Sequence, residues 1–152
     1  MTASPRHRVL IASDHAGVEV KVELIRYLQS LGLTVTDLGP NDTTPVDYPL
    51  FAHRLARAVV AGDGDWGVLI CGSGIGMSIA ANKVPGARAA LVHEAYTARM
   101  AREHNDANIV VLGARVIGME IMKASLQAFA TTAFAPGDDG RHARRVQQLD
   151  PS

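Results

Sequence analysis

The only cysteine of the chain, Cys71, stands between a short apolar run and a glycine-rich turn. Glycine follows it at every second position, at Gly72, Gly74 and Gly76. Glycines allow the backbone to turn sharply and to bring its N–H groups close to a bound group. The helix expected after the turn adds the partial positive charge of its N-terminus. The pattern predicts a thiol base or nucleophile beside an anion hole, although a buried structural cysteine would give the same pattern.

The turn after Cys71 matches none of the familiar glycine motifs. A Walker A loop ends in Gly-Lys-Ser/Thr, whereas Gly76 is followed by Met77 and Ser78. The dinucleotide fingerprint is G-x-G-x-x-G, and the chain has G-x-G-x-G. Met77 also replaces the arginine of a cysteine phosphatase loop, and Ser73 lacks the flanking glycines of a nucleophile elbow. A thiol with backbone donors remains, which favours stabilisation of an oxyanion over phosphate transfer.

Composition predicts one globular domain over residues 1–152. The chain has 152 residues, of which 47% are hydrophobic and 20% charged, and its formal net charge is zero. Zero net charge gives no argument for a nucleic-acid or membrane partner. One cysteine excludes an internal disulfide, and no apolar stretch is long enough for a membrane span. We therefore predict a soluble, cytoplasmic protein.

Five apolar segments alternate with five helical segments along the chain. The predicted strands are 9–13, 33–38, 66–70, 88–92 and 108–112, and the predicted helices are 18–31, 50–61, 77–83, 95–103 and 118–132, followed by a tail helix from Arg141. This order predicts an α/β fold: a three-layer αβα sandwich with a five-stranded parallel sheet, Rossmann- or flavodoxin-like, plus the tail helix. Ligands bind such sheets at the carboxyl ends of the strands, which are followed here by Asp14-His15, Cys71-Gly72-Ser73, His93-Glu94 and Gly113-Ala114-Arg115.

Two further side chains have both a structural and a chemical interpretation. Asp14 can cap the helix after the first strand, or it can polarise a hydroxyl. His104 follows the fourth helix, where it can complement the helix dipole or serve as an acid or base near neutral pH. No His, Cys or Asp spacing resembles a metal ligand set, so we predict no metal.

Arginines gather late in the chain, at Arg115 and in the tail at Arg141, Arg144 and Arg145. Charge pattern alone favours a solvated helix face for the tail. Arginine is also suited to bidentate capture of phosphate. Together with a base, an oxyanion hole and an acid, such arginines would serve the isomerisation of a sugar phosphate.

Six motifs occur in order and closely resemble the type B ribose-5-phosphate isomerase family, which includes galactose- and allose-6-phosphate isomerases. They are Ser13-Asp14-His15-Ala16-Gly17, Asp47-Tyr48-Pro49, Cys71-Gly72-Ser73-Gly74-Ile75-Gly76, Ile79-Ala80-Ala81-Asn82-Lys83, His104-Asn105-Asp106 and Gly140-Arg141-His142. The resemblance extends from about residue 9 to residue 146. One branch of the family uses a glutamate one residue past the last loop glycine, where this chain has Met77, so the chain resembles the cysteine branch. Ser73 stands where some members have threonine.

The resemblance implies a role for each matched residue. It implies that Cys71 moves the proton between C1 and C2, and that Ser73 and the amides from Gly72 to Gly76 hold the enediolate. It further implies that Asp14 and His104 open the sugar ring and that Tyr48 and Asn105 contact the sugar. The residues that it implies for phosphate binding are His15, Arg115, Arg141 and Arg145.

The resemblance also implies a homodimer or tetramer, without metal or organic cofactor. In such an assembly the His104 side of the site comes from the neighbouring subunit, and the tail, residues 136–152, contacts that subunit. The expected reaction interconverts ribose 5-phosphate and ribulose 5-phosphate, as in the pentose phosphate pathway. Allose 6-phosphate, galactose 6-phosphate and erythrulose 4-phosphate remain alternatives. The alternative from another functional class is a non-catalytic module that binds a phosphosugar. A module of the receiver type would have an aspartate at the position of Cys71.

Overall fold

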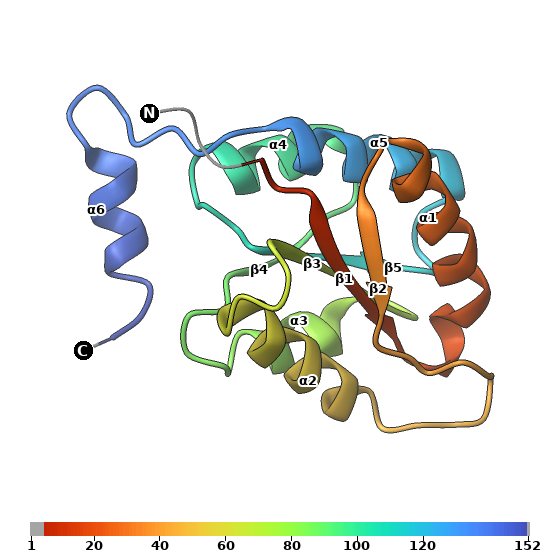
Figure 1. The fold of residues 1–152 in the computed structure, drawn as a ribbon. Coiled ribbons are helices and arrows are strands. Elements are labelled where there is room, and N and C mark those ends of the chain that lie inside the picture. Colours follow the sequence, from red (N-terminus) through yellow and green to blue (C-terminus); the bar gives the residue numbers. More distant parts are fainter. Residues whose placement is uncertain (1–4, 152) are drawn as a thin grey trace.

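The computed structural model describes residues 5–151 as a parallel sheet with helices on both faces (Figure 1). The strands are β1 (Arg8–Ser13), β2 (Thr34–Asp37), β3 (Trp66–Cys71), β4 (Ala89–Leu91) and β5 (Ile109–Gly113). All neighbours pair in parallel, in the order β2-β1-β3-β5-β4. The predicted fold class is therefore confirmed.

The helices lie within two residues of the predicted positions at nearly every boundary. They are α1 (Val18–Ser30), α2 (Tyr48–Val60), α3 (Ile75–Ala81), α4 (Ala95–Glu103), α5 (Met119–Thr131) and α6 (Arg141–Gln147). A short 3-10 helix, η1 (His15–Gly17), precedes α1 and was not predicted. Asp47 stands at the N-cap of α2 as expected, but its side chain makes no capping hydrogen bond.

Two hydrophobic layers enclose the sheet, and β3 contributes to both. Helices α1, α4 and α5 cover one face and α2 and α3 the other (Figure 1). Because successive strand residues point to opposite faces, Trp66, Val68 and Ile70 enter the first layer, whereas Leu69 and Cys71 enter the second. The ring of Trp66 packs 5.2 Å from that of Phe129 in α5. The apolar packing of β3 thus places Cys71 at the end of a rigid central strand.

The order of the strands determines where a ligand can bind. The chain moves from β1 outward to β2, and then returns to the other side of β1 with β3. This switch point lies between β1 and β3, and ligands of such sheets bind in the crevice at the carboxyl ends of the strands there. Asp14 follows β1 and Cys71 ends β3, so both stand at the switch point.

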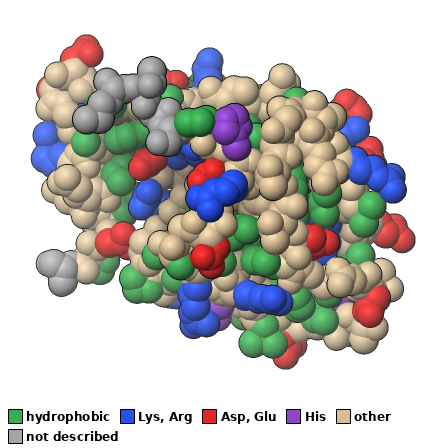
Figure 2. Space-filling view, viewed as in Figure 1, with side chains coloured by type: hydrophobic (Ala, Val, Ile, Leu, Met, Phe, Trp, Pro, Cys, Tyr) green, Lys and Arg blue, Asp and Glu red, His purple; other side chains and the backbone are tan. Residues whose placement is uncertain are grey.

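The tail helix α6 stands apart from the two layers and has no buried residue (Figure 1). On the face shown in Figure 2, acidic and basic side chains are mixed, in keeping with the zero net charge of the sequence. None of the helices described is long and apolar enough to cross a membrane.

Candidate active site

The carboxyl edge of the sheet has an open cavity of about 360 Å³ with Cys71 in its wall. Cys71 is 5% exposed, and its Sγ accepts a hydrogen bond from the Gly74 N–H at 3.1 Å. The lining residues are Asp14, Tyr48, Cys71, Gly72, Ser73, Gly76, Arg115 and Val116. Seven residues of the predicted site therefore meet around one cavity.

The glycines allow the loop after β3 to pack tightly against its neighbours. Gly74 has a φ of 80°, and a Cβ there would lie 2.5 Å from the Leu91 side chain. A Cβ at Gly76 would lie 2.6 Å from the ring of Tyr48, so the tyrosine rests directly on the loop. The spacing of the glycines thus fixes both the turn and the position of Tyr48.

The predicted oxyanion hole is smaller than the whole loop. The Gly74 N–H is directed to Cys71 Sγ, and the Ile75 N–H donates to Ser73 Oγ at 3.2 Å. Within residues 5–151, the N–H groups of Gly72, Ser73 and Gly76 have no hydrogen-bond partner. These three amides are therefore the donors of the predicted hole that remain for an anionic oxygen at the cavity of Cys71.

Asp14 and His15 are both held by backbone N–H groups. Asp14 is 8% exposed, and its Oδ1 accepts from the Ala16 N–H at 2.9 Å, as the capping interpretation predicts. This bond engages one carboxylate oxygen and fixes the side chain at the cavity wall. The Nδ1 atom of His15 accepts from the Val46 N–H at 3.2 Å, which requires the proton of the neutral ring to be on Nε2.

Arg115 reaches the loop because β3 and β5 continue to pair past their ends. Ala114 N–H donates to the Cys71 carbonyl at 2.8 Å, and Arg115 N–H donates to the Gly72 carbonyl at 2.9 Å. The Arg115 guanidinium then lies over Gly72, where a Cβ would be 3.3 Å from Nη1. The site thus has a permanent cation close to the free amides.

His104 and Asn105 lie at the opposite edge of the sheet. Helix α4 begins after β4 at the carboxyl edge and runs back, so His104 at its end stands before β5, at the amino edge. The five residues of β5 alone span about 16 Å. One chain therefore does not bring His104 to Cys71. Asn105 lines a separate cavity of about 400 Å³ with residues of β4 and the tail.

The tail helix is attached beside His104. The rings of His104 and His142 are 4.3 Å apart, and the Nδ1 atom of His142 lies 2.9 Å from the Ala135 carbonyl oxygen. Arg141 and Arg145 are exposed on this helix. The predicted residues thus form two groups. His142 joins the second group, although its sequence motif did not indicate a role for it.

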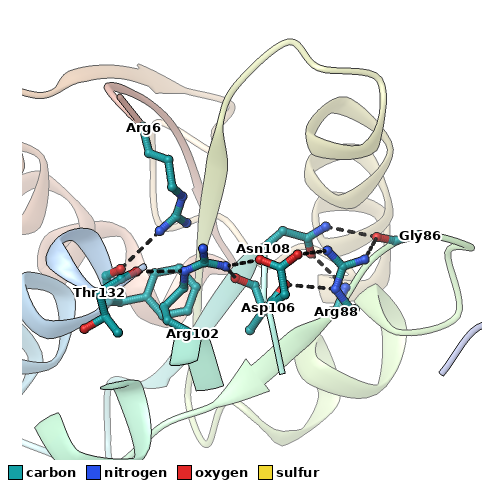
Figure 3. Close-up of polar contacts among 9 residues, drawn as sticks. Arg6, Gly86, Arg88, Arg102, Asp106, Asn108 and Thr132 are labelled. Atoms are coloured by element: carbon teal, nitrogen blue, oxygen red, sulfur yellow. Dashed lines mark hydrogen bonds and ion pairs between the residues drawn. The ribbon is translucent and has the colours of Figure 1, made fainter. Parts of the chain in front are cut away.

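An ion network holds the turn that carries His104 and Asn105 (Figure 3). Asp106, with a φ of 45°, accepts from Arg102 at 2.8 Å and from Arg88 at 3.3 Å. Arg102 is 5% exposed and donates in addition to the Ala107 carbonyl at 2.6 Å. These residues come from α4, from the position just before β4 and from the turn, so sequence periodicity did not reveal them.

Arg6 completes this region at the start of β1. It donates to the Phe129 carbonyl at 3.2 Å, and burial, together with the charge of Arg102, lowers the pKa of Arg6 to about 10. The amino edge is thus rich in arginine, with Asp106 as the carboxylate shared by Arg88 and Arg102.

Replacing Asp106 by asparagine is expected to destabilise the fold by about 1–3 kcal/mol, because it leaves the buried Arg102 without its counter-charge. Asparagine tolerates the left-handed backbone, so the substitution tests the charge alone. Urea unfolding measures the change, and Asp63→Asn at an exposed position is the matched control. Equal midpoints for both variants would contradict a stabilising role of the network.

Among residues 5–151, no three His, Cys, Asp or Glu side chains lie close enough to form a metal site.

Comparison with known proteins places the chain among sugar-phosphate isomerases. A family model described as Ribose/Galactose Isomerase matches residues 9–149. The Escherichia coli protein named ribose-5-phosphate isomerase B is 39% identical over 142 residues, which are 93% of each chain. The D-erythrulose-4-phosphate isomerase of Pectobacterium atrosepticum is 42% identical over 93% of this chain and 91% of its own. The solved structure of Clostridium thermocellum ribose-5-phosphate isomerase B superposes with a TM-score of 0.90 at 45% identity, over 93% and 94% of the two chains.

Proposed function

The chain belongs to the ribose/galactose isomerase family, and we propose that it interconverts D-ribose 5-phosphate and D-ribulose 5-phosphate through an enediolate. The observation that carries this proposal is the cavity at the switch point, where the Cys71 thiol, three free amides and the Arg115 guanidinium meet. Proton abstraction beside a carbonyl requires such a combination of a base and donors for the developing oxyanion.

The chemistry follows from the position of the thiol. The Cys71 thiolate removes the proton from C2 of the open-chain aldose, and the electrons of that bond form the C1–C2 double bond. The carbonyl oxygen on C1 gains the negative charge, which the free amides of the loop, Gly72, Ser73 and Gly76, stabilise. The thiol then returns the proton to C1, and the proton of the C2 hydroxyl moves to the C1 oxygen. The products are a ketose and a regenerated thiolate.

The remaining residues bind the substrate or open its ring. Asp14 in the cavity wall and His104 act on the ring oxygen and its hydroxyl as acid and base. Tyr48 and Asn105 contact the sugar. His15, Arg115, Arg141 and Arg145 bind the phosphate, which arginine holds through charged, bidentate hydrogen bonds.

We propose that each site is built from two chains. The carboxyl edge carries Cys71, and the amino edge carries His104, Asn105 and the tail arginines. A two-fold axis that places the carboxyl edge of one chain against the amino edge of the other completes two sites at once. A homodimer is the smallest assembly with this property, and two dimers can join in a tetramer.

Exposed apolar side chains near the carboxyl edge support this assembly. Ile75 and Ile79 lie one turn apart on α3 and are 54% and 57% exposed. Tyr96 at the start of α4 is 62% exposed, and Val116 after β5 is 54% exposed. Large apolar side chains that are left exposed at one edge of a sheet are typical of protein interfaces. The tail, residues 136–152, would then lie on the neighbouring chain.

One relative supports a second candidate within the same chemistry. The Pectobacterium protein named for D-erythrulose 4-phosphate is 42% identical, as similar as the relative named for ribose 5-phosphate. The thiol, the amides and the arginine act only on the first two carbons and the phosphate, so they suit a four-, five- or six-carbon chain. A non-catalytic sugar-phosphate module is the weaker alternative, since such a module has no need of a thiol beside free amides.

The experiment compares kcat/KM for ribose 5-phosphate, allose 6-phosphate, galactose 6-phosphate and erythrulose 4-phosphate. We expect the highest value for ribose 5-phosphate, in line with the pentose phosphate pathway and a cytoplasmic location. A higher value for another sugar phosphate would replace the substrate and keep the mechanism. No turnover of any of the four would contradict the proposed function.

A further inference from the structure

Lys21 is a buried lysine that none of the proposed catalytic steps uses. It lies in the first turn of α1 and is 1% exposed. Lysine is rarely buried to this degree unless its charge is paired. Its Nζ atom donates to Asp37 Oδ1 at 2.8 Å and to the Pro40 carbonyl oxygen at 2.5 Å. The burial of this charge is therefore matched by a carboxylate and a carbonyl at the end of β2.

The two partners of Lys21 begin the segment that joins β2 to α2. Asp37 Oδ1 also accepts from the Gly39 N–H at 2.8 Å. The Gly39 carbonyl in turn accepts from the Ser13 N–H at 3.1 Å, one residue before Asp14. We refer to residues 38–47 as the β2–α2 loop. Lys21 thus fastens the start of this loop to the carboxyl edge of the sheet.

The other end of the β2–α2 loop carries two contacts of the active site. The Val46 N–H donates to His15 Nδ1, and Tyr48, just past the loop, rests on Gly76. His15 belongs to η1, directly before the helix that carries Lys21. A loop fastened at Pro40 has only a few residues in which to move before Val46.

We propose that Lys21 is a positioning residue that holds the β2–α2 loop so that Val46 fixes the orientation and tautomer of His15. With Nδ1 accepting, the neutral His15 ring has its proton on Nε2, the nitrogen left free to donate to an anion. The inference rests on the proposed function in one respect, namely that His15 binds the substrate phosphate. Its structural part, the control of His15 by Lys21, does not depend on the substrate.

The test replaces Lys21 by methionine, which keeps a long apolar chain and removes the charge. We expect KM for ribose 5-phosphate to rise about tenfold, the effect of weakening one hydrogen bond to a charged group. We expect kcat to change less than about threefold, because His15 takes no part in the proton transfer. Long-range nitrogen–proton NMR spectra of the histidine rings should show His15 leaving the single Nε2–H form.

Two variants complete the design. Lys123 in α5 forms another ion pair with α1, to Glu23 at 3.1 Å, and among the described residues its ion pairs do not include the β2–α2 loop, so Lys123→Met is the matched control. It should leave KM and the His15 spectrum unchanged. Asp37→Asn keeps an acceptor for Gly39 and removes the counter-charge of Lys21, so it should shift both readouts in the same direction as Lys21→Met.

The outcomes separate this inference from the proposed function. A Lys21→Met protein with wild-type KM and an unchanged His15 spectrum would overturn the inference. If Lys21→Met does not fold, Asp37→Asn decides by the same criteria. If the wild-type protein does not isomerise ribose 5-phosphate, the proposed substrate fails. The His15 spectrum then still decides whether Lys21 controls the ring.

Discussion

Replacement of Cys71 by alanine is expected to lower kcat for ribose 5-phosphate isomerisation about a hundred- to ten-thousand-fold. A positioned base contributes a factor of this size to a proton transfer. Cys71 lines the cavity beside the free amides of the loop. The chain has no second cysteine that could replace its thiol. KM should change little, since the sulfur contacts the reacting carbons and not the phosphate.

The controls for Cys71→Ala separate chemistry from packing. The side chain is small and 5% exposed, so alanine leaves only a small void. Met77 is fully buried in the same hydrophobic layer, and Met77→Leu should keep kcat within a few-fold, because volume-conserving core changes are well tolerated. Circular dichroism and thermal unfolding verify the fold of both proteins. Retention of more than about a tenth of kcat in Cys71→Ala would mean that Cys71 is structural.

A heterodimer of one Cys71→Ala chain and one His104→Ala chain is expected to recover about half of the wild-type activity, although each homodimer is nearly inactive. If each site takes Cys71 from one chain and His104 from the other, one of the two sites in the heterodimer has both residues intact. In a homodimer of either variant, both sites lack one catalytic residue. The rate at each site then falls by the factor that one acid or base contributes. The heterodimer is isolated by co-expression with two different affinity tags, and its initial rate is measured.

A second heterodimer makes this test reciprocal. A wild-type chain paired with a Cys71→Ala/His104→Ala chain has one defect in every site if the sites are shared, so it should be nearly inactive. If each chain contains a whole site, the two results are exchanged: the first heterodimer is inactive and the second keeps half of the activity. That exchange would contradict the two-chain site. It would also require His104 to reach Cys71 from the far edge of its own sheet.

The sequence was sufficient to predict the sheet, because the central strands are short apolar runs that end at polar or glycine residues. Trp66–Cys71 is buried throughout, and its boundary at Cys71 follows directly from the glycines after it. The same reasoning placed Asp14 and Arg115 correctly at the carboxyl edge. It did not reveal the distance of His104 from Cys71 within one chain, and only the family resemblance implied that His104 acts from a neighbouring subunit. The fold explains the distance, since a helix that begins at one edge of a parallel sheet ends at the other.

The parts that escaped prediction depend on contacts between distant segments. In the sequence, Lys21 is an ordinary residue of a helix. Only the fold shows that its ammonium group donates hydrogen bonds to Asp37 and to the Pro40 carbonyl. The network at Asp106 likewise joins residues from three segments. The extent of the oxyanion hole depends on which N–H groups of the loop already donate within the loop. The Gly74 N–H donates to the Cys71 sulfur and is therefore not free. Residue types specify such partners only after the backbone has placed them.

The central claim is that the Cys71 thiol carries a proton between C1 and C2 of ribose 5-phosphate. The most direct measurement is the NMR spectrum of ribulose 5-phosphate formed by the wild-type protein in deuterium oxide. A thiol in an open cavity exchanges its proton with solvent, so we expect deuterium at C1 in part of the product, formed at a rate that collapses in Cys71→Ala. Product formed equally fast by Cys71→Ala, with or without deuterium at C1, would contradict the account.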